Sequence, residues 1–214
     1  MLNDNGQNTN SIEIRGTVAS PFTFSHEVYG EGFYSFMAQT ERLSESVDLL
    51  PVMVSERLTS DMNFNIGDLV DIYGQVRSYN NYIQEERRNR LLITIFAREI
   101  ELLEAGALTP KSPNNVFLDG FICKKPIFRE TPFGREIADI LLAVNRSYNK
   151  SDYIPCICWG RNAKFAATLE VSDNVRINGR LQSRIYQKKY DDGSVVEKTA
   201  YEISISKIEL VKET

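Results

Sequence analysis

Residues 153–186, YIPCICWGRNAKFAATLEVSDNVRINGRLQSRIY, carry the clearest structural signal in the chain. The first seven residues predict a strand, and its period of two places Ile154, Cys156 and Cys158 together on the core face. Asn162 to Leu169 is rich in alanine and favours a short helix, with Asn162 as its N-cap. Asn174 to Tyr186 predicts a long second strand of this stretch, with Val175, Ile177 and Leu181 on its core face.

Further strands are expected on both sides of this stretch. Residues 115–123 alternate before it, residues 137–144 are expected to form another strand, and residues 198–210 alternate after it. Asp192-Gly193 is a hairpin turn signal between the last two strands. Five strands with one helix between the third and fourth is the order of an OB-fold, a five-stranded Greek-key barrel.

The first half of the chain repeats this pattern. Five segments match in order at an offset of 104 to 108 residues: 14–16 with 118–120, 50–52 with 154–156, 66–70 with 171–175, 72–76 with 177–181, and 100–103 with 208–211. Ordered matches at a nearly fixed offset indicate a duplication. The expected fold class is therefore all-β, with two tandem OB-fold five-stranded Greek-key barrels, each with one short helix.

The repeat predicts the domain organisation. Residues 1–10 are polar and are expected to form a disordered tail. Residues 105–113 contain Pro110 and Pro113 and are expected to be a linker. One OB-fold domain is expected at 11–104 and a second at 114–214.

Charge divides the chain in the same place. Residues 1–112 contain 9 Lys and Arg against 16 Asp and Glu, whereas residues 113–214 contain 16 against 13. The net charge of −4 is thus the sum of an acidic first half and a basic second half. This difference indicates that the two halves have different partners or different roles.

Several classes of function find little support. The only histidine, His26, lies far from the three cysteines, so we expect neither a metal site nor a cofactor, and no enzyme. Cys123, Cys156 and Cys158 do not form an even framework of disulfides. No apolar run is long enough to span a membrane, and the N-terminus does not resemble a secretory signal. We therefore expect a cytoplasmic protein.

Aromatic and basic side chains share the outward face of the second half. The alternation that turns the cysteines inward turns Tyr153, Ile157 and Trp159 outward. The next strand and the turns nearby add more of both kinds: Arg146, Tyr148, Lys150, Arg176, Arg180, Arg184, Tyr186, Lys188, Lys189 and Tyr190. Bases stack on exposed rings while cations follow the phosphates, so this combination is typical of single-strand binding.

At these residues the second half resembles the bacterial single-stranded DNA-binding protein family. The resemblance lies in residues 115–120, 128–134, 142–146 and 177–186, and is strongest over 114–210. It implies four base-stacking positions, which fall on Tyr148, Tyr153, Trp159 and Tyr186. It also implies basic contacts at Arg129, Arg146, Arg161 and Arg184. Family members often end in an acidic tail that recruits other proteins, and we do not expect recruitment of this kind from residues 1–214.

These positions predict that 114–214 is an OB-fold domain that binds single-stranded DNA. The domain at 11–104 is expected to be a degenerate OB-fold, because it has lost most of them. Ser44, Leu49 and Ser55 stand where the second half has Tyr148, Tyr153 and Trp159. Its hairpin still offers Tyr82, Arg87, Arg88 and Arg90 as contacts to a passing strand. Because family members pair their domains, we expect this half to pack on the second as an intramolecular pseudo-dimer. Association of two chains into a homodimer is a further expectation.

The sequence thus predicts a non-sequence-specific single-stranded DNA-binding protein of replication, recombination or repair. Bases would stack on the aromatics of the second OB-fold. Two alternatives stay open. One is an OB-fold accessory of the primosome type, which docks proteins on its acidic half and binds nucleic acid weakly. The other is RNA as the ligand.

Overall fold

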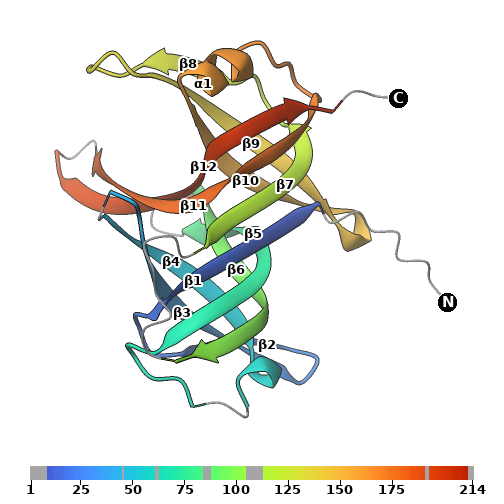
Figure 1. Cartoon of the computed structure of the whole chain (residues 1–214), viewed down its shortest axis with the longest axis vertical. Helices are drawn as coiled ribbons and strands as arrows, with labels where there is room; N and C mark the ends of the chain where they lie inside the picture. The colour runs from blue at the N-terminus through green and yellow to red at the C-terminus, as the bar shows by residue number, and fades with distance from the viewer. Residues whose placement is uncertain are drawn as a thin grey trace.

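The computed structural model describes residues 9–44, 46–60, 63–83, 88–104, 113–190 and 193–211. Figure 1 shows the strands of the first half below those of the second. The first half contains β1 (Asn10–Val18), β2 (Thr23–Val28), β3 (Glu31–Glu41), β4 (Val47–Ser55), η1 (Glu56–Leu58), β5 (Leu69–Ile83) and β6 (Arg88–Leu103). The second contains β7 (Asn114–Ile122), β8 (Ile127–Glu130), β9 (Glu136–Arg146), η2 (Ser147–Asn149), β10 (Lys150–Trp159), α1 (Arg161–Ala166), β11 (Asn174–Lys189) and β12 (Val195–Leu210).

Five strands of the second half close a ring. β7 pairs with β11, β11 with β12, and β10 with β9, all antiparallel. β10 runs parallel to β12, with Cys156 opposite Ile203, and β7 meets β9 to complete the ring. In the first half β1, β5, β6, β4 and β3 pair in the same way. The expected all-β OB-fold class is confirmed.

Each half has a sixth strand that the sequence did not indicate. β2 pairs with β3, and β8 pairs with β9, outside the ring. Every residue of both strands is exposed, so neither shows the alternation that predicts a strand. The turns that follow them contain Gly30 at φ 79° and Gly134 at φ 71°, in the left-handed region that glycine tolerates.

The helix expectation is right for one half only. α1 follows β10 and buries Ala163 and Ala166 against the second barrel. Its N-cap is Gly160 and not the expected Asn162, whose side-chain amide instead donates to the Ser206 carbonyl at 3.0 Å. At the corresponding place in the first half, the described residues form only the 3₁₀ turn η1.

On β10 the burial of side chains follows the predicted alternation with one exception. Cys156 and Cys158 are buried free thiols, and burial raises the pKa of Cys158 to about 12. Ile157 was expected to face outward but is only 4 % exposed. It lies on a strand with neighbours on both sides, where residues of β9 and β12 flank it. Its side chain therefore forms the floor of a groove and not an open surface.

Two glycine positions, which occur in both copies of the repeat, explain why the barrels can close. A Cβ on Gly120 would meet the carbonyl oxygen of Ala143, and one on Gly179 would meet that of Ser204. In the first half, Gly16 and Gly74 stand equally close to backbone carbonyls. The matched glycines thus allow strands to approach where any side chain would clash.

The two halves join edge to edge through their first strands. β1 pairs antiparallel with β7 from Asn10 opposite Leu118 to Ile14 opposite Asn114, and Figure 1 shows these strands side by side. β1 begins at Asn10, within the range expected to be the tail, and the Asn10 amide donates to the Val76 carbonyl at 2.7 Å. Residues 105–112 of the expected linker lie outside the described residues, as does Asp192 of the hairpin turn.

Candidate nucleic-acid interface

Five arginines and the single tryptophan line one groove on the second half. It has a volume of about 450 Å³, and Ile137 and Ile157 contribute to its floor. We call it the arginine groove and define it by Arg42, Arg129, Arg135, Trp159, Arg180 and Arg184. Such a groove combines a ring for a base with cations for the phosphates on either side.

Trp159 is the aromatic wall of the arginine groove. It is the last residue of β10, and its side chain is 40 % exposed. The residue before it, Cys158, points into the core, so the alternation of the strand holds the indole on the outer face. A half-exposed ring on a buried strand is rigid enough to stack on a base and open enough to be reached.

Neighbouring side chains hold three of the guanidinium groups in place. Arg129 pairs with Asp139 at 2.9 Å, and Arg184 pairs with Glu202 at 3.4 Å. Arg180 donates to the Gln182 side chain at 3.1 Å. Burial, followed by the nearby charge of Arg42, lowers the pKa of Arg180 below its ordinary value. A phosphate in the groove would relieve this mutual repulsion.

Arg42 reaches the arginine groove from the first half. It follows β3 and binds the buried carboxylate of Asp48 at 2.5 Å, and it donates to the Ser183 carbonyl of β11 at 2.8 Å. Asp48 also accepts from the Ser183 backbone at 2.6 Å. Burial raises the pKa of Asp48, but the hydrogen bonds from Arg42 and Ser183 outweigh burial and lower it overall.

A second cavity adjoins the first where β11 leaves the barrel. It has a volume of about 220 Å³, and Arg184, Tyr186 and Tyr201 are among its lining residues. The Arg184 guanidinium lies 5.7 Å from the centre of the Tyr186 ring. Arg90 of the first half also lines this cavity and donates to the Thr199 carbonyl at 3.2 Å. Arg184 thus borders both cavities.

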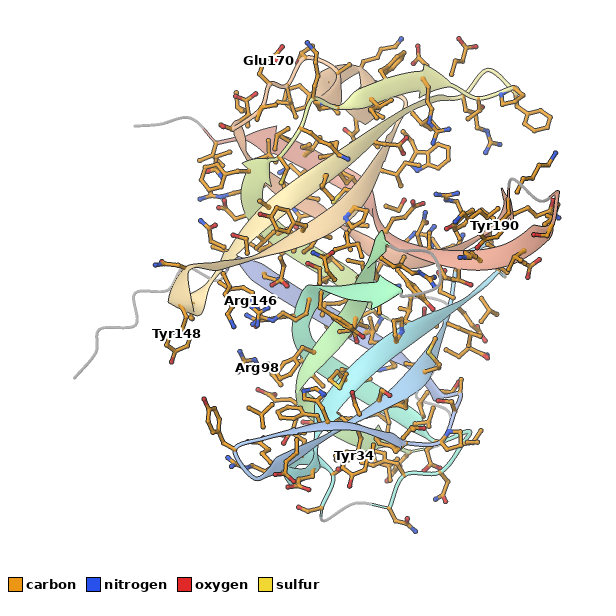
Figure 2. All side chains as sticks on the ribbon, turned by 180° about the vertical axis from the view of Figure 1, so that it is seen from behind. Tyr34, Arg98, Arg146, Tyr148, Glu170 and Tyr190 are labelled. Carbon is orange, nitrogen blue, oxygen red and sulfur yellow. The ribbon has the colours of Figure 1, made fainter. Side chains whose placement is uncertain are left out.

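The hairpin of β11 and β12 extends beyond these cavities. The Lys188 ammonium lies 4.2 Å from the centre of the Tyr190 ring, and Lys189 is exposed. In Figure 2 Tyr190 lies at the far end of this hairpin, on the side opposite Tyr148. Two cations and a ring therefore project from the same arm.

Four other predicted residues gather at the opposite end, around η2. They are Arg146, Tyr148, Lys150 and Tyr153, and none lines either of the two cavities. Tyr148 is 93 % exposed at φ 61°, and Tyr153 is 44 % exposed. The Tyr153 backbone donates to the Ser78 hydroxyl of the first half at 2.7 Å. This cluster therefore borders the first half and not the arginine groove.

The last two predicted residues lie elsewhere. Arg176 pairs with Asp119 at 2.9 Å, on the part of β11 that pairs with β7. Arg161 is exposed at the first residue of α1. Sequence reasoning missed Arg42 and Arg135, whereas it did offer Arg90 of the first half's hairpin as a contact to a passing strand. Arg42 comes from the other half, which no local pattern reveals, and Arg135 lies in the exposed turn between β8 and β9.

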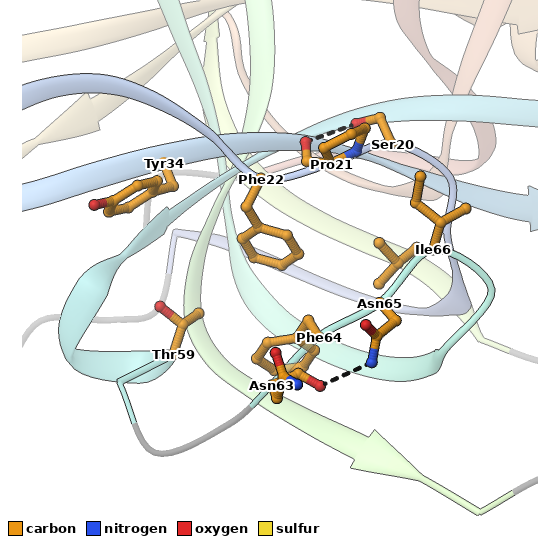
Figure 3. Close-up of a pocket in the computed structure, with 10 residues that line it drawn as sticks. Ser20, Pro21, Phe22, Tyr34, Thr59, Asn63, Phe64, Asn65 and Ile66 are labelled. Atoms are coloured by element: carbon orange, nitrogen blue, oxygen red, sulfur yellow. Dashed lines mark hydrogen bonds between the residues drawn. The ribbon is translucent and has the colours of Figure 1, made fainter.

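The first half contains a further cavity of about 600 Å³, shown in Figure 3. Its walls combine apolar and uncharged polar side chains, and the rings of Phe22 and Phe64 stack within it at 5.3 Å. No arginine or lysine is among the residues that line it. It lies beside residues 63–66, which follow η1 in place of a helix like α1. Its chemistry does not suit a phosphate backbone.

The fold and the arginine groove together define an OB-fold protein with a basic and aromatic ligand face. Within the described residues no helix is long and apolar enough to cross a membrane, and no three metal-ligating side chains lie together. Comparison with known proteins agrees with this class. Residues 113–211 match the model of the single-strand binding protein family.

Relatives and solved structures give the same result. The chain is 36% identical over 83 residues to single-stranded DNA-binding protein A of Bacillus subtilis, covering 36% of this chain and 48% of that protein. It is 34% identical over 83 residues to protein B of the same strain, covering 36% and 74%. The single-stranded DNA-binding protein from Thermus aquaticus superimposes with a TM-score of 0.74 at 17% identity, over 96% of this chain and 94% of that one.

The chain belongs to the single-strand binding protein family. Proteins of this family are not enzymes, in agreement with the expectation from the sequence. The chain spans about half the length of the first relatives it matches. The Thermus likeness extends over both halves and concerns the fold alone.

Proposed function

We propose that the protein binds single-stranded DNA without sequence preference, by stacking bases on Trp159 and Tyr186. The observation that carries the proposal is the arginine groove, in which five guanidinium groups surround one half-exposed indole. Stacking accepts any base, and arginines neutralise phosphates regardless of sequence. The names of the relatives, which bind single-stranded DNA, support the same ligand. Replication, recombination or repair would be the setting of this activity.

The proposal assigns the two halves, 11–104 and 114–214, to one pseudo-dimeric unit. Reciprocal contacts support this assignment. Asp48 of the first half accepts from the Ser183 backbone, and Asp152 of the second half accepts from the Ser78 backbone at 2.7 Å. These residues correspond in the repeat, so the same contact is made twice. The first half would then complete the DNA site through Arg42.

A binding titration tests the proposed function. Labelled oligo-dT should bind the full chain, and Trp159→Ala should weaken binding by about 1–3 kcal/mol. Leu49→Ala is the matched control, because Leu49 corresponds in the repeat to Tyr153 and is 45 % exposed outside both cavities. Its affinity should equal that of the wild type. Equal affinities for all three proteins would overturn the role of the groove, and tighter binding of oligo-U would replace DNA with RNA.

A further inference from the structure

The first half has a row of aromatic rings that its lost stacking positions do not predict. His26 stacks on Phe33 with centres 5.1 Å apart and planes 10° apart. Phe33 lies 5.8 Å from Phe96, and the Arg98 guanidinium lies 5.6 Å from the centre of the Phe96 ring. His26 and Arg98 are exposed, and the two phenylalanines are half-buried. We call these four residues the first-half strip.

The position of the strip follows from the repeat. Ser55 corresponds to Trp159, and Phe33 pairs with Ser55 across β3 and β4. Phe96 lies on β6, on the other side of β4. Because Ser55 is small, rings from the two flanking strands can meet above β4. In the second half the arrangement is reversed: Trp159 stands on the central strand, and Ile137 and Ser204 occupy the flanks.

A chain of cations leads from the strip to the second half. Arg98 donates to the Gln75 side chain at 3.2 Å, and Arg77 donates to the same oxygen. Arg77 also pairs with Asp152 at 2.9 Å, where Arg146 joins at 3.5 Å. Figure 2 shows Arg98 and Arg146 on the same side of the molecule. The residues around η2, which include Arg146 and Tyr148, are thus connected to the first-half strip through Arg77 and Gln75.

This series of linked arginines repeats the arrangement found at the arginine groove. By the repeat, Arg146 corresponds to Arg42, Asp152 to Asp48, and Ser78 to Ser183. Arg42 and its carboxylate bring a cation of the first half to the second half's groove. In the same way, Asp152 holds the guanidinium of Arg146, a cation of the second half, beside the first half.

The local charge favours an anion despite the acidity of the first half. Two guanidinium groups, those of Arg77 and Arg146, contact the carboxylate of Asp152, and the guanidinium of Arg98 adds a third positive charge beside Gln75. Glu31 lies nearby, but it pairs with Arg57 at 3.1 Å and accepts from the Ser55 hydroxyl. The charge around the strip is therefore positive, although the net charge of this half is negative.

We propose that the first-half strip is a second contact site for single-stranded DNA, with bases on Phe33 and Phe96 and phosphates on Arg98 and Arg146. This site rests on the proposed function, and it extends that function to the half whose expected stacking positions are lost. A strand long enough for both halves would contact the arginine groove and the strip together. A short strand would occupy the groove alone.

Two lengths of oligo-dT separate the two sites. One of about 8 nucleotides suits a single OB-fold, and one of about 30 nucleotides suits two. Binding is followed through Trp159, the only tryptophan. The double variant Phe33→Leu/Phe96→Leu keeps apolar volume over Ser55 but removes the rings. It should bind the long oligomer about fivefold or more weakly, and the short oligomer as tightly as wild type.

Two further variants make this result specific. Phe24→Leu removes a 57 % exposed ring of the same hairpin outside the strip and should change neither affinity. Arg98→Gln removes one exposed charge without burying anything, and should make the salt dependence for the long oligomer shallower by about 0.7 in log–log slope. An unchanged long-oligomer affinity and slope in both strip variants would overturn the second site and leave the proposed function standing. If the wild-type protein bound neither oligomer, the result would contradict both the second site and the proposed function.

Discussion

Asp48 on β4 accepts a hydrogen bond from the backbone of Ser183 on β11 over 2.6 Å, and this contact ties the two halves together. The carboxylate is fully buried and holds Arg42 at 2.5 Å. Arg42 in turn lines the arginine groove. One buried acid of the acidic half therefore orients a cation in the ligand site of the basic half.

Removal of this acid should destabilise the fold. Asp48→Ala leaves the Arg42 guanidinium without its carboxylate and the Ser183 N–H without an acceptor, at a cost of about 3 kcal/mol. Urea unfolding of the full chain measures the loss. Asp139→Ala is the matched control, because its pair with Arg129 is exposed and should cost less than about 1 kcal/mol. Equal losses for the two variants would contradict the account of Asp48.

The same acid should give the stability a pH dependence. The pKa of Asp48 is lowered below 3.8 in the folded protein, so the folded state binds its proton less readily than the unfolded state does. The stabilisation is complete above the unfolded pKa and is lost as pH falls through the folded one. The stability difference between wild type and Asp48→Asn should therefore stay constant near neutral pH and shrink below about pH 4. A difference that grows on acidification would contradict this sign.

Cations inside and outside the groove should differ in their effect on binding. Arg135 lines the arginine groove, whereas Arg176 pairs with Asp119 beside β7. Arg135→Gln should make the log–log dependence of oligo-dT affinity on salt shallower by about 0.7, because one phosphate contact is lost. Arg176→Gln should leave the slope unchanged, although the sequence placed it on the binding face. A salt series with each variant measures both slopes, and a larger change for Arg176→Gln would exclude the groove as the phosphate path.

Tyr186 should contribute to binding beyond the groove. Its ring lines the second cavity beside Arg184. Tyr186→Leu should weaken oligo-dT binding by about 1 kcal/mol or more, whereas Tyr73→Leu should not, because Tyr73 lies on β5 beside Glu13. Fluorescence anisotropy of labelled oligo-dT compares the two variants. Equal affinities would remove Tyr186 from the site.

Alternation made most of the ring strands predictable. Strands such as β10 have one buried face, so their cysteines and Trp159 sort correctly by period. β2 and β8 were not predicted, because neither face of these strands is buried. The expectation for Ile157 was wrong because the period of two assigns a side chain to one face of a strand. It does not say whether neighbouring residues cover that face.

The site was predictable only where its residues belong to one half. Trp159 and Arg180 follow from strand period within the second half. Arg42 could not be found in this way, because its place depends on how the halves pack through Asp48 and Ser183. For the same reason Arg146 was assigned to the second half's face, whereas its carboxylate partner Asp152 links it to Arg77 of the first.

The most direct test of the central claim is a titration of Trp159 fluorescence with oligo-dT at increasing salt. Trp159 is the only tryptophan and stands in the arginine groove, so its emission reports the groove itself. Base stacking should quench the emission, and added salt should weaken binding as counterions compete for the phosphates. Emission that stays constant at saturating oligo-dT and low salt would contradict the claim that single-stranded DNA binds in this groove.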